Sequence, residues 1–139
     1  MEETTKETLE GTLAGKILQA KRELQATFDA IPDPILILDE GFAIRRANRA
    51  LATFLAMDVR SLVGRRCHSL WMESEEPCIQ CPVRTSLEEG RPVESDYHPV
   101  KPGGREFLSR SFPLGSGPEK GAVLYLRDVT EEKRLEAML

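Results

Sequence analysis

The sequence of 139 residues has no long hydrophobic run and no excess of basic charge. No stretch approaches the roughly 18 apolar residues that a membrane-spanning helix needs, so we expect no direct contact with a membrane. The N-terminus is acidic and rich in threonine, without the basic and apolar regions of a secretory signal, which predicts a cytoplasmic location. The net charge of −4 gives no electrostatic reason to expect a nucleic acid as partner.

The sequence motifs of common enzymes are also lacking. There is no glycine-rich phosphate loop, no HExxH zinc motif and no GxSxG nucleophile motif. A thiol–disulfide enzyme would place its Cys-x-x-Cys pair just after a strand in a βαβ unit, and Cys78 and Cys81 do not follow such a strand. We therefore expect a protein without catalytic activity.

What is present fits one folded domain with an N-terminal helix. The composition is 40% hydrophobic and 30% charged, which suits a single modest core. Residues 1–8 are polar and predict a disordered tail. Residues 9–31 carry apolar side chains at steps of three and four, which predicts an amphipathic or coiled-coil-like helix. Its apolar stripe, which we expect to be buried in a homodimer or against its own domain, consists of Leu13, Ile17, Ala20, Leu24 and Phe28.

Prolines, glycines and capping residues divide the remainder of the chain into short elements. Two strands, a series of helices and a three-strand meander predict an α+β fold, with one antiparallel sheet of five strands and short helices on one face. The expected elements are strands over 34–39 and 42–46, a helix capped by Asn48, a helical turn over 61–64, an irregular stretch over 65–81, a helix over 82–90, strands over 93–100, 106–114 and 121–129, and a last helix capped by Thr130.

This order and five local motifs resemble the PAS domain family over about residues 24–135. The motifs are Ile31-Pro32-Asp33-Pro34-Ile35, Asn48-Arg49-Ala50, Leu62-Val63-Gly64, Gly104-Arg105-Glu106-Phe107 and Asp128-Val129-Thr130. Each motif alone is weak, but their common order and spacing are specific. The resemblance implies a PAS core over 32–130, preceded by the amphipathic helix and followed by the start of an output helix over 131–139.

The cysteines form a C-x10-C-x2-C-P pattern made by Cys67, Cys78 and Cys81. A C-x2-C pair at a helix start can present two thiolates to one ion, and a third cysteine can close the site. The fourth ligand is unknown, with His68 and His98 as the two histidines available. Zinc, an iron–sulfur cluster, a disulfide or redox pair, and inert thiols that only stabilise the loop all remain open. The pattern also resembles a cysteine-containing subgroup of PAS domains in bacterial signalling proteins.

Two other cofactors of the family are not expected. Residues 64–71 resemble the flavin-binding branch at Cys67, but Arg66, His68, Ser69 and Trp71 replace the residues that would contact a flavin. Haem-binding members carry a histidine on the helix that here spans 82–90, and this helix has none.

The family resemblance implies a sensory signal-input domain of a bacterial signal-transduction protein such as a histidine kinase, with an output domain downstream in the same chain. The signal would enter near the cysteine loop, as redox state or as metal or iron–sulfur status, or at an apolar pocket inside the sheet. Asp128 and Thr130 would hand the signal to the last helix, Thr130 as its N-cap and Asp128 through hydrogen bonds or a cation such as Lys133 or Arg134. The alternative is a structural dimerisation module without a ligand of its own.

Overall fold

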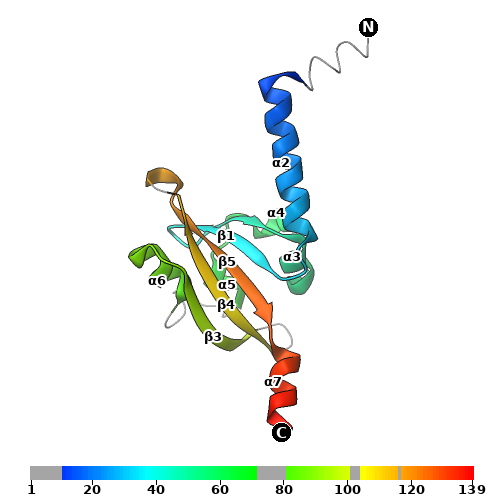
Figure 1. The fold of residues 1–139 in the computed structure, drawn as a ribbon, viewed down its shortest axis with the longest axis vertical. Helices are drawn as coiled ribbons and strands as arrows, with labels where there is room; N and C mark the ends of the chain where they lie inside the picture. Colours follow the sequence, from blue (N-terminus) through cyan, green and yellow to red (C-terminus); the bar gives the residue numbers. More distant parts are fainter. Residues whose placement is uncertain (1–10, 72–80, 101–103, 116) are drawn as a thin grey trace.

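The computed structural model describes residues 11–71, 81–100, 104–115 and 117–139 (Figure 1). The predicted tail over 1–8 and Cys78 lie outside these residues. The helices are α2 (Leu13–Ala30), α3 (Arg49–Leu55), α4 (Val59–Leu62), α5 (Cys67–Trp71), α6 (Pro82–Glu89) and α7 (Thr130–Ala137), with a 3-10 turn η1 (Gly117–Glu119). The strands are β1 (Ile35–Asp39), β2 (Ile44–Ala47), β3 (Val93–Val100), β4 (Arg105–Leu114) and β5 (Gly121–Asp128).

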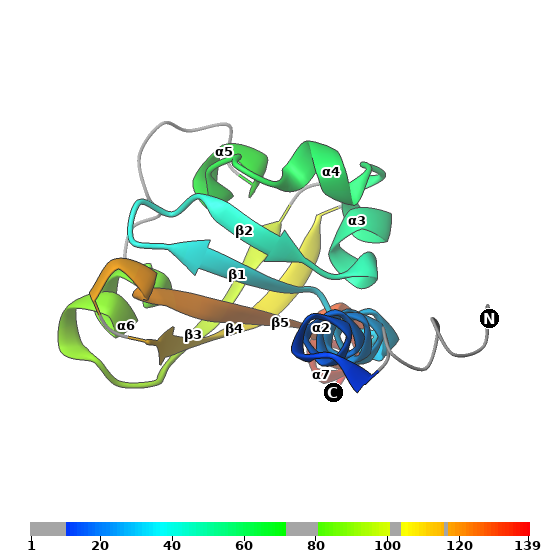
Figure 2. The same ribbon diagram turned by 90° about the horizontal axis from the view of Figure 1, so that it is seen from above.

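The strands form one antiparallel sheet in the order β2-β1-β5-β4-β3. The β1–β2 hairpin is therefore joined to the meander of β3, β4 and β5 by the pairing of β1 with β5, the first and last strands in the sequence. Helices α3, α4 and α5 lie over one side of this sheet in the view from above (Figure 2), and α6 contacts β3, β4 and β5. The expected α+β architecture, with five strands and an N-terminal and a C-terminal helix, is confirmed.

The core lies between the sheet and these helices. Alternate residues of β5 are buried, namely Ala122, Leu124 and Leu126, because successive side chains of a strand point to opposite faces. They meet apolar side chains from the other elements, which are Leu36, Leu38, Ile44, Ala47, Leu51, Leu62, Cys67, Val83, Leu87 and Phe107. One face of the sheet thus supplies the interior of the domain, as the alternating sequence pattern requires.

Two local predictions need correction. The second strand begins at Ile44 rather than at residue 42, because Phe42 has a left-handed backbone with φ of 68° that a strand cannot include. The stretch over 65–81, predicted to be irregular, contains the short helix α5. In α5, Cys67 and His68 are buried, so this helix belongs to the packed part of the domain.

Helix α2 has no buried residue and projects away from the domain (Figure 1). Leu13 is 75% exposed, Ile17 50% and Leu24 56%, so most of the predicted stripe is not covered by this chain. Phe28 is half-buried where the C-terminal end of α2 approaches α3. The expectation that the stripe packs against its own domain is therefore wrong for the first turns of the helix. No described helix has both the length and the apolar character needed to cross a bilayer.

Candidate functional site

The ends of α2 and α7 meet the sheet in one region, which we call the helix junction and define by Asp29, Asp33, Asn48, Asp128 and Thr130. The two helices leave the domain in opposite directions along one line, as both views show (Figures 1 and 2). A change in the sheet at this junction would therefore reach both helices.

Asn48 is the central residue on the α2 side, and it is fully buried. Its Oδ1 accepts hydrogen bonds from the amides of Ile35 at 3.0 Å and Leu51 at 3.1 Å, so it caps α3 as predicted. Its Nδ2 donates to the carbonyl oxygens of Asp33 at 2.9 Å, and of Phe28 and Ile31 at 3.3 Å each. One side chain therefore joins the end of α2, the start of β1 and the start of α3.

A second contact holds α2 at the same place. The carboxylate of Asp29 accepts a hydrogen bond from the backbone amide of Arg49 at 3.0 Å, and another from the Gln25 side chain at 3.0 Å. Helix α2 thus supplies, through Asp29, the acceptor for the backbone amide at the start of α3. Sequence reasoning missed this contact, because an aspartate near a helix end gives no signal of its partner 20 residues away.

Asp128 and Thr130 connect the sheet to α7. Oδ1 of Asp128 accepts from the amide of Thr130 at 2.9 Å and from its hydroxyl at 2.6 Å, while Oδ2 lies 3.2 Å from Nη1 of Arg105. The Thr130 hydroxyl in turn accepts from the amide of Glu106 at 2.9 Å. The last strand, the start of β4 and the first residue of α7 are therefore linked through two side chains.

The structure changes the predicted role of Thr130, while Asp128 accepts hydrogen bonds at the helix start as predicted. Thr130 is not the N-cap, since α7 begins at Thr130 after Val129, and its hydroxyl bonds to β4 instead of to the helix amides. Asp128 supplies the acceptor for the first helical amide. Its ion-pair partner is Arg105 rather than Lys133 or Arg134, because Arg105 begins β4, the strand next to β5.

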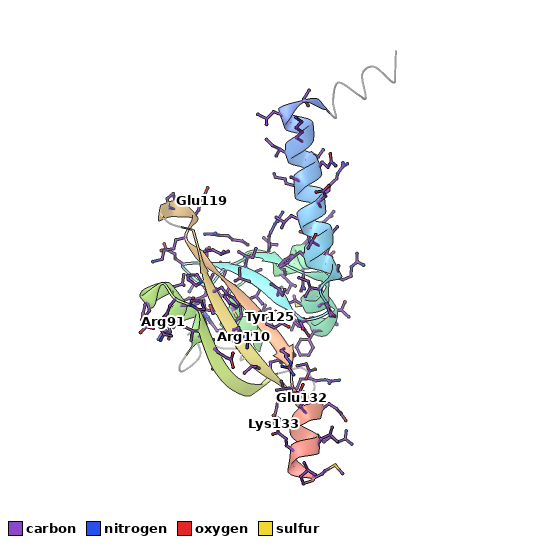
Figure 3. The ribbon with its side chains drawn as sticks, viewed as in Figure 1. Arg91, Arg110, Glu119, Tyr125, Glu132 and Lys133 are labelled. Carbon is purple, nitrogen blue, oxygen red and sulfur yellow. The ribbon has the colours of Figure 1, made fainter. Side chains whose placement is uncertain are left out.

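The outer side of β5 carries further polar contacts at the junction. Arg127 forms an ion pair with Glu132, which lies with Lys133 at the start of α7 where the helix leaves the sheet (Figure 3). The hydroxyl of Tyr125 donates a short hydrogen bond to the carboxylate of Asp33. These pairs were not predicted, because their members lie on different elements and share no local motif.

Tyr125 is expected to ionise at a higher pH than an ordinary tyrosine. The hydrogen bond to Asp33, then burial and then the Asp33 charge raise the pKa of Tyr125 above 10.0. Because the folded state holds this proton more tightly, the resulting stabilisation is present below pH 10 and is lost as the pH rises through the folded pKa.

We predict that Asp33→Asn lowers the pKa of Tyr125 toward 10.0, since the acceptor loses its charge. Tyrosinate absorbance in an alkaline titration checks this, in a Tyr97→Phe background that leaves Tyr125 as the single tyrosine. Glu88→Gln, on α6, removes one exposed carboxylate elsewhere and should leave the pKa unchanged. An equal shift in both variants would refute the direct role of Asp33.

The predicted cysteine site is only partly within the described residues. Cys67 is buried, Cys81 is half-buried against the core, and both His68 ring nitrogens lack a hydrogen-bond partner among the described residues. Cys67, His68 and Cys81 do not form a three-residue metal-binding group, and the described part of the chain holds no other such group. Cys78 and the side chain of His98 lie outside the described residues.

Comparison with known proteins identifies the family. The PAS fold family model matches residues 28–134, which include the sheet, its helices and the junction. The chain belongs to the PAS fold family. No curated protein sequence matches the chain.

Solved PAS structures are similar in fold. The PAS domain of nitrogen regulation protein NR(II) from Vibrio parahaemolyticus is 20% identical with a TM-score of 0.61, covering 75% of this chain and 95% of that one. A PAS domain from Colwellia psychrerythraea is 19% identical with a TM-score of 0.64, covering 83% and 98%. VqmA of Vibrio cholerae, in a complex with ligand and DNA, is 20% identical with a TM-score of 0.58, covering 84% and 56%. These identities support the fold and not a shared ligand.

Proposed function

We propose that this chain is a signal-input PAS domain, in which the helix junction passes a change in the sheet to α7 and to an output domain beyond it. The observation that carries the proposal is the pair of Asp128 and Thr130, which links β4 and β5 to the first residue of α7. The similar structures include a nitrogen regulation protein and a DNA-bound receptor, which suits a module that serves regulation.

The energy of these contacts has the size that a switch needs. A hydrogen bond of this kind contributes about 1 kcal/mol, which changes the ratio of two states about fivefold. Two arrangements of a helix that differ by a few kcal/mol are therefore sensitive to the loss of one contact. Asp128 and Thr130 each make more than one contact, so each is expected to affect the ratio.

A fusion of this chain to the dimeric core of a histidine kinase tests the proposal, with α7 continuing into the first helix of the kinase. We expect Asp128→Ala and Thr130→Val each to change basal autophosphorylation about fivefold. Glu131→Gln, an exposed change on the same helix, is the control and should leave the rate unchanged. Wild-type rates in both junction variants, with normal folding, would contradict the proposed handover.

The exposed α2 stripe favours dimerisation. Dimerisation is compatible with a signal-input domain, and it would be the only function of the alternative, a structural module without a ligand. Leu13, Ile17 and Leu24 lie on one face of α2 and form an apolar surface that the described residues of this chain leave uncovered. Because α2 and α7 lie on one line, a parallel pair of chains would bring both helices onto one two-fold axis. A second copy is thus the expected partner of the stripe.

We predict a concentration-dependent dimer that Leu24→Glu weakens at least about tenfold, since a charge in an apolar interface must be desolvated. Sedimentation equilibrium measures the dissociation constant. Arg22→Glu, an exposed change on the opposite face of α2, is the matched control. A monomer at all concentrations, or equal constants for both variants, would exclude this interface.

Sensing at the cysteines stays a separate hypothesis. The C-x10-C-x2-C spacing and the buried His68 support it. Because Cys67, His68 and Cys81 alone do not form a three-residue metal-binding group, a metal site would need Cys78 as a ligand. Metal analysis and an absorption spectrum of protein purified without oxygen decide the matter. Stoichiometric metal that Cys78→Ser removes supports a metal or iron–sulfur site, and metal-free, colourless protein overturns it.

A further inference from the structure

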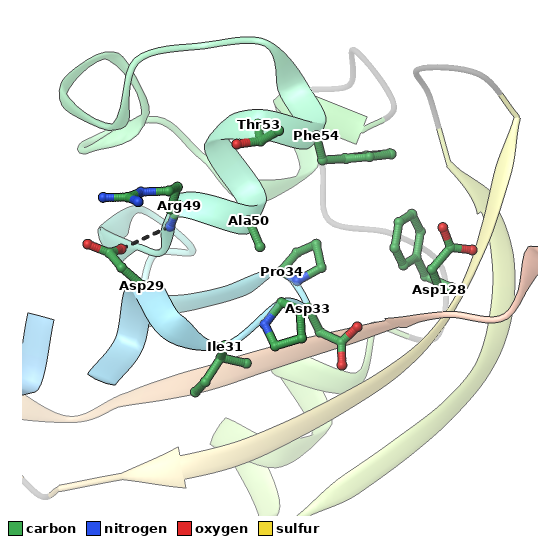
Figure 4. Close-up of a pocket in the computed structure, with 11 residues that line it drawn as sticks. Asp29, Ile31, Asp33, Pro34, Arg49, Ala50, Thr53, Phe54 and Asp128 are labelled. Carbon is green, nitrogen blue, oxygen red and sulfur yellow. Dashed lines mark hydrogen bonds between the residues drawn. The ribbon is translucent and has the colours of Figure 1, made fainter. Parts of the chain in front are cut away.

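A cavity of about 390 Å³ opens at the helix junction, between the end of α2, the segment over 31–34, α3 and the ends of β4 and β5 (Figure 4). This volume lies within the range of small-molecule sites in proteins. Its apolar walls come from Ile31, Pro32, Pro34, Ala50, Phe54 and Phe107. Phe54 and Phe107 meet edge to face with ring centres 5.0 Å apart, so they offer a firm aromatic surface.

The charged groups around this cavity are mostly acidic. Three carboxylates line it, from Asp29, Asp33 and Asp128, against the single guanidinium of Arg49. That guanidinium lies on the Asp29 side, away from Phe54 and Asp128 (Figure 4). Because Arg105 balances the charge of Asp128, the uncompensated negative charge on the side away from Arg49 is that of Asp33.

Two of these carboxylates have no cationic partner in the part of the chain that the structure describes. Asp29 accepts hydrogen bonds from an amide of the backbone and from Gln25, and Asp33 accepts from the neutral phenol of Tyr125. Neither forms an ion pair with any residue that the structure describes. Asp128, in contrast, pairs with Arg105. An occupant with a positive charge would supply the missing counter-charge, and an anion would be repelled.

We propose that this cavity binds a small amphiphilic cation, with an ammonium group beside Asp33 and an apolar body against Phe54 and Phe107. The carboxylate gives the charge selectivity, and the apolar wall gives the contact area. Aromatic rings also attract a cation through their faces, which adds to the preference for an amine. The proposal does not depend on the signalling function, because binding is a property of this chain alone.

The test uses three probes that share one aromatic body: 2-phenylethylamine, the neutral 2-phenylethanol and the anionic phenylacetate. Each is titrated into the ¹⁵N-labelled chain, and amide shifts report the site and the dissociation constant. We expect 2-phenylethylamine to shift amides of Ala50 and Thr53, and to bind about fivefold more tightly than 2-phenylethanol, a factor typical of one partly exposed ion pair.

Variants separate the cavity from non-specific attraction. Asp33→Asn, which keeps the acceptor for Tyr125, should remove the preference for the amine, while Glu88→Gln on distant α6 should keep it. Ala50→Phe should fill the cavity and abolish binding of both probes, and the amide spectrum shows whether each variant is folded. Shifts spread over the surface, equal effects of the Asp33 and Glu88 changes, or phenylacetate binding as tightly as the amine would overturn the proposal.

Discussion

Replacing Asn48 by alanine is expected to lower the free energy of unfolding by about 3 kcal/mol, because buried amides and carbonyls lose their partner at once. The amides of Ile35 and Leu51 lose an acceptor, and the carbonyl of Asp33 loses its donor at 2.9 Å. No water reaches a fully buried side chain to replace these bonds without rearrangement. Urea unfolding measures the loss.

The matched control is Asp58→Ala, which removes the cap of α4. Asp58 is exposed and makes one capping bond, to the amide of Arg60 at 3.0 Å, so its loss is expected to cost only about 1 kcal/mol. Equal losses at Asn48 and Asp58 would mean that Asn48 is an ordinary cap and does not hold the three segments together.

The Asn48→Asp variant adds a dependence on pH. A carboxylate at this position would face carbonyl oxygens of Phe28, Ile31 and Asp33 without the donor that they require. Burial disfavours the charged form, so the folded pKa of the new acid would lie above the unfolded value of about 3.9. The variant should therefore be most stable below about pH 4 and lose stability as the pH rises, in contrast to Asn48→Ala.

Replacing Gly121 by alanine is expected to destabilise the protein by about 3 kcal/mol through overpacking. A Cβ atom at Gly121 would lie 2.2 Å from the carbonyl oxygen of Leu38 and 3.1 Å from Nη1 of Arg45. Leu38 belongs to the neighbouring strand, and Arg45 is held by carbonyls of Glu119 and Lys120 at 3.0 and 2.9 Å. The Leu38 carbonyl cannot move without opening the contact between β1 and β5, and the Arg45 side chain would have to give up hydrogen bonds to make room.

Gly41→Ala is the control for this change. Gly41 is exposed at the turn before β2, and a Cβ atom there would make an ordinary contact of 3.4 Å with Asp39. Its effect on unfolding in urea should stay within about 0.5 kcal/mol. If Gly121→Ala lowered the free energy of unfolding as little as Gly41→Ala, β1 and β5 would separate easily at this end and the overpacking account would be wrong.

The sequence was sufficient for the elements whose signals are local. Pro82 and Gly90 bracket α6, and β3 and β4 lie within one residue of the strands predicted over 93–100 and 106–114. Asn48 was recognised as a cap because its partner Leu51 lies three residues away. Contacts that depend on the tertiary fold were missed, such as Asn48 with the end of α2, since nothing at residue 28 or 31 marks the carbonyls that it binds.

The same distinction explains the corrections at the exit helix. Thr130 stands next to acidic residues, a pattern typical of an N-cap. However, the start of β4 lies close to it, and the backbone amide of Glu106 donates a hydrogen bond to the Thr130 hydroxyl. Asp128 accepts hydrogen bonds at the start of the helix, as one of its two predicted roles, but its cation is Arg105, because the sheet register places Asp128 opposite Phe107 in β4. Both roles depend on strand pairing, which local sequence patterns do not specify.

The measurement that tests the signalling account most directly is a phase scan of the kinase fusion. Alanine insertions between Leu139 and the kinase helix span one heptad, roughly seven residues, and each rotates the kinase relative to α7. The account predicts that autophosphorylation rises and falls about twice over this series, with a period of about 3.5 residues, and that Asp128→Ala reduces the amplitude because α7 is then less firmly joined to the sheet. The same rate at every insertion length, with dimeric and folded fusions, would contradict transmission through α7.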